Sequence, residues 1–99
     1  MGHCKKVPKM IQVGDLIKLK TSENRSISMR NARKDELGCR KEIAYTRGHP
    51  PVLILGKNTS NNPNDDRPHK VKVLHDGQIW IFRFKWLDSL ETFFRKVNP

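Results

Sequence analysis

The sequence predicts a mainly β protein, a small five-stranded antiparallel barrel with one long insertion between its first and second strands. Three observations support this fold class. The apolar residues fall into short clusters, at 11–19, 51–55, 71–74 and 79–97. Apolar and polar residues alternate in several of these clusters with the period of a β-strand. An Asp-Gly pair separates the two most regular runs, which is typical of the tight type I′ turn of a hairpin.

The predicted hairpin at 70–87 supplies most of the apolar core. Its turn is the segment HDGQ at 75–78. Successive side chains of a strand point to opposite faces, so the second strand separates its residues cleanly. One face takes the aromatic residues Trp80, Phe82, Phe84 and Trp86. The other face takes Ile79, Ile81, Arg83 and Lys85. In a chain this polar, we expect the aromatic face to form the core rather than an exposed platform for stacking bases.

The chain begins with a short basic arm at 1–10, which precedes a single domain at 11–99. The first strand is expected at 11–20. Within it, Ile17 and Leu19 share one face, and lysines occupy the opposite face. The arm is expected to be flexible, because Pro8 interrupts it and most of its charge is basic.

The insertion at 21–49 shows no β alternation. Ser28 is suited to cap a short helix over 29–37, and Gly38 is suited to end that helix in a left-handed conformation. The segment 41–46 is helical or extended. The sequence therefore predicts a partly helical insertion, and a connection this long in a small domain is normally functional or disordered.

The remaining elements follow in order. Residues 52–55 predict a strand that is apolar on both sides, covered on both faces and ended by Gly56. Residues 57–69 are rich in Asn, Asp, Ser and Pro, which predicts an exposed loop. Residues 87–90 suit a single 3₁₀ turn. The last strand is expected at 91–97.

The charge of the chain is strongly basic. Lys and Arg number 20 against 10 Asp and Glu, which gives a formal net charge of +10 at pH 7. Such a balance in a small domain favours a polyanionic neighbour, either nucleic acid or an acidic protein surface.

Several functional classes are disfavoured. The sequence has no Gly-rich phosphate loop, no nucleophile–base pairing and no G-x-S-x-G motif, so we expect a protein that is not an enzyme and needs no cofactor or small-molecule substrate. A zinc set drawn from His3, Cys4, Cys39 and His49 lacks the paired spacing of zinc sites. A bridge between Cys4 and Cys39 requires an oxidising compartment. No apolar run is long enough to cross a membrane, and the N-terminus lacks the apolar core of a signal peptide, which favours an intracellular, reduced setting.

A resemblance to a known family lies in three segments: VGDLIKLK near the start, VLILGK in the middle, and VKVLHDGQIWIFRFKWLDSLE near the end. They resemble the small SH3-like β-barrel proteins of tailed bacteriophages, and barrels of the KOW type look similar. The predicted order of strands, with a short turn before the last one, is also that of an SH3-like barrel. The chain departs from the compact phage versions through its insertion at 21–49. The resemblance implies a non-enzymatic binding or structural module in host cytoplasm or in a phage particle.

Two functions follow from the charge and the resemblance. The favoured one is a virion structural or assembly component that docks on a capsid, neck or tail through basic arms, with Ile79 and Ile81 as apolar contacts. The alternative is a DNA- or RNA-binding module without sequence preference, in which Tyr45 or Trp86 stacks a base if it is exposed. The candidate contacts from the barrel are Lys18, Lys20, Lys70, Lys72, Ile79, Ile81, Arg83 and Lys85. Those from the insertion are Arg30, Arg33, Lys34, Arg40 and Lys41.

Overall fold

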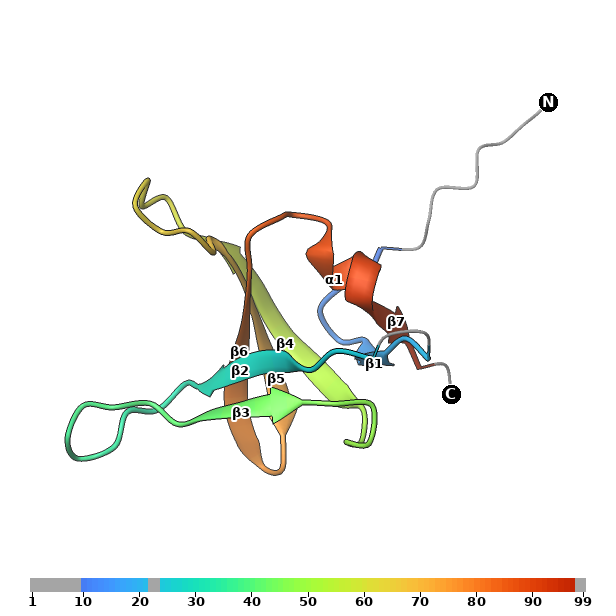
Figure 1. The fold of residues 1–99 in the computed structure, drawn as a ribbon, viewed down its shortest axis with the longest axis horizontal. Helices are drawn as coiled ribbons and strands as arrows, with labels where there is room; N and C mark the ends of the chain where they lie inside the picture. The colour runs from blue at the N-terminus through green and yellow to red at the C-terminus, as the bar shows by residue number, and fades with distance from the viewer. Residues whose placement is uncertain (1–9, 22–23, 98–99) are drawn as a thin grey trace.

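The computed structural model describes residues 10–21 and 24–97. Its strands form one antiparallel sheet of seven strands in the order β3-β2-β6-β5-β4-β1-β7, curled into a half-barrel (Figure 1). The short helix α1 packs at one end beside β7 (Figure 1). The elements are β1 (Leu16–Leu19), β2 (Ile27–Asn31), β3 (Glu42–Tyr45), β4 (Val52–Thr59), β5 (His69–His75), β6 (Gln78–Phe84), α1 (Ser89–Phe93) and β7 (Phe94–Lys96). The predicted arm lies outside the described residues apart from Met10.

The predicted hairpin is confirmed as β5 and β6. The two strands pair from His69 opposite Phe84 to His75 opposite Gln78. Asp76 and Gly77 of the turn both have positive φ, 54° and 74°, as a type I′ turn requires. The inward residues of the hairpin are buried: Val71, Val73, Trp80, Phe82 and Phe84.

Trp86 does not join this aromatic face, so its predicted place in the core is wrong. Strand β6 ends at Phe84, two residues before Trp86. Because the chain turns away there toward α1, the alternation of a strand no longer applies. The indole of Trp86 is 62% exposed.

The insertion contributes a second hairpin, and the prediction of a helix over 29–37 is wrong. Strands β2 and β3 pair with each other, and β2 also pairs with β6, Met29 lying opposite Phe82. Ser28 caps no helix, because its hydroxyl donates to a carboxylate oxygen of Glu42 at 3.2 Å. The edge of β6 offers backbone donors and acceptors, and a strand satisfies them whereas a helix does not. The sheet therefore has seven strands instead of the five predicted.

The five strands expected from the sequence are all present, as β1, β4, β5, β6 and β7, and they are neighbours in the order β7-β1-β4-β5-β6. Ile17 and Leu19 of β1 are buried, as predicted. The turn before the last strand is the one-turn helix α1 rather than a 3₁₀ turn, so β7 begins only at Phe94.

Strand β4 is longer and less covered than predicted. It continues past Gly56 to Thr59, and its register against β5 shifts between Ile54 and Gly56. A bulge of this kind lets a strand continue through a residue that would otherwise end it. Leu55, at the bulge, is exposed, so the expectation that both faces of this strand are covered is wrong.

Tyr45 closes the core between the two hairpins. Its ring lies 5.8 Å from that of Phe82 and 5.9 Å from that of Phe94, centroid to centroid. Its hydroxyl donates to the backbone carbonyl of Pro50 at 2.8 Å, and burial raises its pKa to about 12. Tyr45 is fully buried, so it does not meet the condition of exposure under which it was expected to stack a base.

The buried aromatic face predicts a large effect of truncation. Phe82→Ala should lower the free energy of unfolding by about 3–5 kcal/mol, because it removes contacts and leaves a cavity, and Trp80→Ala should act similarly. Trp86→Ala should change that free energy by less than about 0.5 kcal/mol, because the indole is exposed. Urea unfolding followed by circular dichroism measures all three variants. A Phe82→Ala protein with an unchanged midpoint would contradict the assignment of the core.

The raised pKa of Tyr45 predicts a loss of stability in alkali. Because the folded-state value of about 12 exceeds the ordinary value of 10.0, the contribution is complete below pH 10 and is lost between pH 10 and 12. At pH 11 the free energy of unfolding of the wild type should be lower by roughly 1–1.5 kcal/mol than it is below pH 10, because Tyr45 ionises more readily in the unfolded chain. The variant Tyr45→Phe lacks the ionisable hydroxyl. Comparing it with the wild type therefore cancels the effect of every other group that ionises in alkali.

The measurement is the difference in unfolding free energy between wild type and Tyr45→Phe at pH 9 and at pH 11. At pH 9 the wild type should be more stable by about 1 kcal/mol, because it keeps the hydrogen bond to Pro50. The difference should shrink or reverse at pH 11. A difference that stays constant would show that the hydroxyl ionises equally in both states.

Candidate functional site

The outer face of the sheet carries the residues that alternate with the core residues. Strand register aligns them in rows across neighbouring strands. In the first row, Arg30 lies opposite Ile81, Ile81 opposite Lys72, and Lys72 opposite Gly56. The second row contains Arg83, Lys70 and Asn58. Both rows run across β6, β5 and β4.

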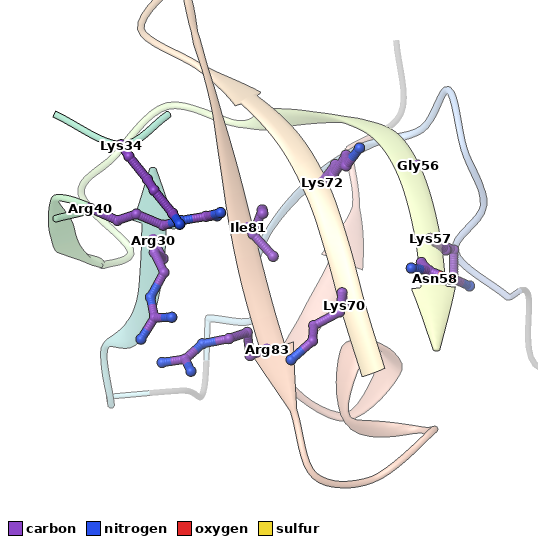
Figure 2. Close-up of a pocket in the computed structure, with 10 residues that line it drawn as sticks. All are labelled: Arg30, Lys34, Arg40, Gly56, Lys57, Asn58, Lys70, Lys72, Ile81 and Arg83. Carbon is purple, nitrogen blue, oxygen red and sulfur yellow. The ribbon is translucent and has the colours of Figure 1, made fainter. Parts of the chain in front are cut away.

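These rows line a groove of about 630 Å³, which we call the basic groove (Figure 2). Seven of its ten lining residues are Lys or Arg, and none is acidic. The lining consists of Arg30, Lys34, Arg40, Gly56, Lys57, Asn58, Lys70, Lys72, Ile81 and Arg83. The groove therefore concentrates positive charge on the outer face of the sheet.

The loop between β2 and β3 brings two of these cations to the groove. Asp35 shapes the loop, because one of its carboxylate oxygens accepts from the backbone N–H groups of Leu37 at 2.9 Å and Cys39 at 2.8 Å. Figure 2 shows the side chains of Lys34 and Arg40 reaching from this loop toward β6.

The base of this loop is fixed by Asn31, a buried polar residue. The Asn31 side-chain amide donates to the amide oxygen of Gln78 at 2.6 Å, and its own oxygen accepts from the backbone N–H of Arg33 at 2.8 Å. These hydrogen bonds join the second hairpin to the start of β6. They restrict where the loop can place its cations.

Two cations of the groove are already paired. Arg30 lies 3.1 Å from Glu42 on the neighbouring strand, and Lys70 lies 2.9 Å from Asp65 in the loop after β4. The hydrogen bonds from Arg30 and then Ser28 lower the pKa of Glu42. Both carboxylates therefore stay ionised at neutral pH, and they offset part of the charge of the groove.

The pKa of Asp65 is lowered chiefly by its hydrogen bond from Lys70, with a further contribution from the backbone N–H of Arg67. A third cation, Lys57, makes no ion pair but donates to the backbone carbonyl of Ile11 at 2.9 Å. Within the part of the chain that the structure describes, the side chains of the remaining four cations of the groove make neither an ion pair nor a hydrogen bond. They are Lys34, Arg40, Lys72 and Arg83.

A second hollow adjoins the basic groove where β6 ends. It has a volume of about 370 Å³, and Arg83 lines both hollows. Its wall includes Lys85, whose ammonium group lies 5.3 Å from the ring centroid of Trp86. We call it the tryptophan hollow.

An apolar row crosses the same outer face beside the basic rows. Leu16 lies opposite Leu53, Leu53 opposite Leu74, and Leu74 opposite Ile79. Three of these residues are exposed, namely Leu16, Leu74 and Ile79. The row offers apolar contact surface next to a basic one.

Seven of the candidate contact residues that the sequence indicates line the basic groove: Arg30, Lys34, Arg40, Lys70, Lys72, Ile81 and Arg83. Lys18 and Lys20 do not line the groove. The reason is that β4 lies between β1 and β5. Arg33 and Lys41 line a separate small hollow at the loop.

Sequence reasoning missed Lys57 and Asn58, which were assigned to a loop. The strand continues through the bulge at Gly56, and that bulge places Gly56 and Asn58 opposite the two lysines of β5. A glycine inside an apolar strand was the signal that could have indicated this bulge.

Residues 10–21 and 24–97 contain no group of three or more His, Cys, Asp or Glu that could hold a metal ion. Of the zinc set considered from the sequence, His3 and Cys4 lie outside the described residues, and Cys39 is an exposed free thiol. No helix in the described part of the chain is long and apolar enough to span a membrane.

Comparisons with protein-family models, with curated protein sequences and with solved structures found no match for this chain.

Proposed function

We propose that the protein is a non-enzymatic module that binds the sugar-phosphate backbone of DNA or RNA in the basic groove. One observation carries the proposal: four cations whose side chains make neither an ion pair nor a hydrogen bond among the described residues line a groove that no acidic side chain lines. Such a groove suits the phosphate groups of a nucleic-acid backbone. Each phosphate that a cation neutralises releases a condensed counterion, and this release favours binding. Arg83 and Arg40 also supply guanidinium groups that can donate two hydrogen bonds to one phosphate.

The proposed mechanism is charge neutralisation without reading of sequence. Sequence readout in a duplex normally places a helix or a two-stranded ribbon in the major groove. The helix α1 has only five residues, Ser89–Phe93, and lies away from the basic groove. The groove is built on the outer face of a sheet, which suits contacts along a backbone rather than with base edges.

The fold supports a finer assignment. The strand order β7-β1-β4-β5-β6, with a short helix before the last strand, agrees with the SH3-like barrel expected from the sequence motifs. In this proposal, β2 and β3 form a hairpin that extends the barrel sheet beyond β6 and adds Arg30, Lys34 and Arg40 to the groove.

Docking on an acidic protein surface is the second candidate, and the apolar row of Leu16, Leu53, Leu74 and Ile79 favours it. An apolar row flanked by cations complements an acidic surface with an apolar centre. The phage-type virion role expected from the motif resemblance belongs to this candidate and stays a prediction. The two candidates separate in one titration, because a module that docks only on protein leaves labelled DNA and RNA unbound at low salt.

Removing two unpaired cations should weaken binding to nucleic acid. The double variant Lys72→Ala/Arg83→Ala should lose at least about tenfold in affinity for labelled DNA of random sequence, since each side chain gives a charge-assisted contact. Fluorescence anisotropy at low salt measures the affinity. Urea unfolding checks that the variant is as stable as the wild type.

Lys18→Ala/Lys20→Ala is the matched control, because it removes the same charge from β1 and from the residue just after it, outside the groove. The control should bind within about twofold of the wild type at low salt, where only long-range attraction changes. Equal losses in both double variants would show that net charge, and not the groove, holds the nucleic acid. A wild type that binds neither DNA nor RNA would overturn the proposal.

A further inference from the structure

Trp86 is an exposed aromatic side chain in the wall of the tryptophan hollow. Its indole is 62% exposed, whereas Trp80 on the preceding strand is 5% exposed and donates its N–H to the backbone carbonyl of His75 at 3.2 Å. Leaving an indole in water forgoes the stabilisation that its burial would give. Trp86 therefore adds little to the core. The ammonium group of Lys85 lies over its ring, and most of the residue stays exposed to solvent.

The tryptophan hollow shares one lining residue, Arg83, with the basic groove. Lys85, in the wall of the hollow, holds its ammonium group 5.3 Å from the centroid of the Trp86 ring. A nucleic-acid backbone that passed from the groove to this hollow at Arg83 would meet Lys85 there. A base attached to that stretch of backbone would be near the indole of Trp86.

We propose that the ligand of the groove is single-stranded nucleic acid, with its backbone along the unpaired cations and one base stacked on Trp86. This inference rests on the proposed function and names its substrate class. The faces of bases in a duplex are covered by their neighbours, so only an unpaired strand can offer a base to an exposed ring. Stacking tolerates any base, which agrees with a site that does not read sequence.

The test uses the full chain with a fluorescein-labelled oligothymidylate of about 12 nucleotides and a duplex of the same length, both at low salt. The wild type should bind the single strand more tightly than the duplex. Trp86→Ala should lose about tenfold in affinity for the single strand and keep its affinity for the duplex. Trp86→Phe should recover part of the loss, because a phenyl ring also stacks.

Intrinsic fluorescence gives a second readout. The emission of the wild type should be quenched by unlabelled oligothymidylate, because a stacked base quenches an indole. Trp86→Phe leaves Trp80 as the remaining tryptophan, and its buried ring should not respond. Leu87→Ala is the matched control, since Leu87 is an exposed apolar neighbour that does not line the hollow, and it should behave as the wild type.

The outcomes separate this inference from the proposed function. If Lys72→Ala/Arg83→Ala weakens binding while Trp86→Ala leaves the affinity for both ligands unchanged, the groove stands and the stacked base is overturned. A wild type that prefers the duplex also overturns the inference. If the wild type binds neither ligand at low salt, both proposals fall.

Discussion

The alternation of side chains along the β5–β6 hairpin is the constraint on which the two faces of this protein depend. Phe82 and its aromatic neighbours on β6 point inward, where Phe82 packs 5.0 Å from Phe94 and 5.8 Å from Tyr45, ring centroid to ring centroid. Because the period of a strand is two, Ile81 and Arg83 between them must point outward. A shift of register by one residue would put cations into the core and aromatic rings on the surface. The aromatic core and the basic groove therefore come from one pattern.

The second hairpin completes the site by a contact that is distant in sequence. Strand β2 pairs with β6, so that Arg30 lies opposite Ile81, and the loop that follows β2 extends Lys34 and Arg40 over the same face. Ion pairs to Glu42 and Asp65 offset two of the cations on the groove, and Lys34, Arg40, Lys72 and Arg83 keep their charge available. Surface pairs of this kind contribute little to stability, so their main effect is to shape the potential of the face.

The sequence predicts local structure well where side chains alternate, and this covers the hairpin, its turn and the buried face of β1. The same alternation places Lys70, Lys72, Ile81 and Arg83 on one face, and the structure agrees. Alternation cannot reveal which strand pairs with the free edge of β6. For that reason, the sequence pattern predicts a capped helix at 29–37. The residues of β2 instead form a strand because they pair with backbone groups of β6, some 50 positions away.

The other differences have equally local causes. The bulge at Gly56 lets β4 continue to Thr59, beyond the expected range of 52–55, because a glycine stops the apolar pattern without stopping the strand. Trp86 continues the sequence pattern of β6 after the strand has ended, so pattern alone assigned it to the core. Lys18 has the right charge and an outward position, but the strand order separates it from the groove.

The measurement that tests the central claim most directly is the salt dependence of the affinity of the wild type for a single strand. Four unpaired cations that each neutralise one phosphate predict a slope of log affinity against log salt concentration of about −3. A slope near that value would agree with a backbone held along the whole groove. A slope close to zero would contradict the account, because binding would then depend on something other than phosphate charge.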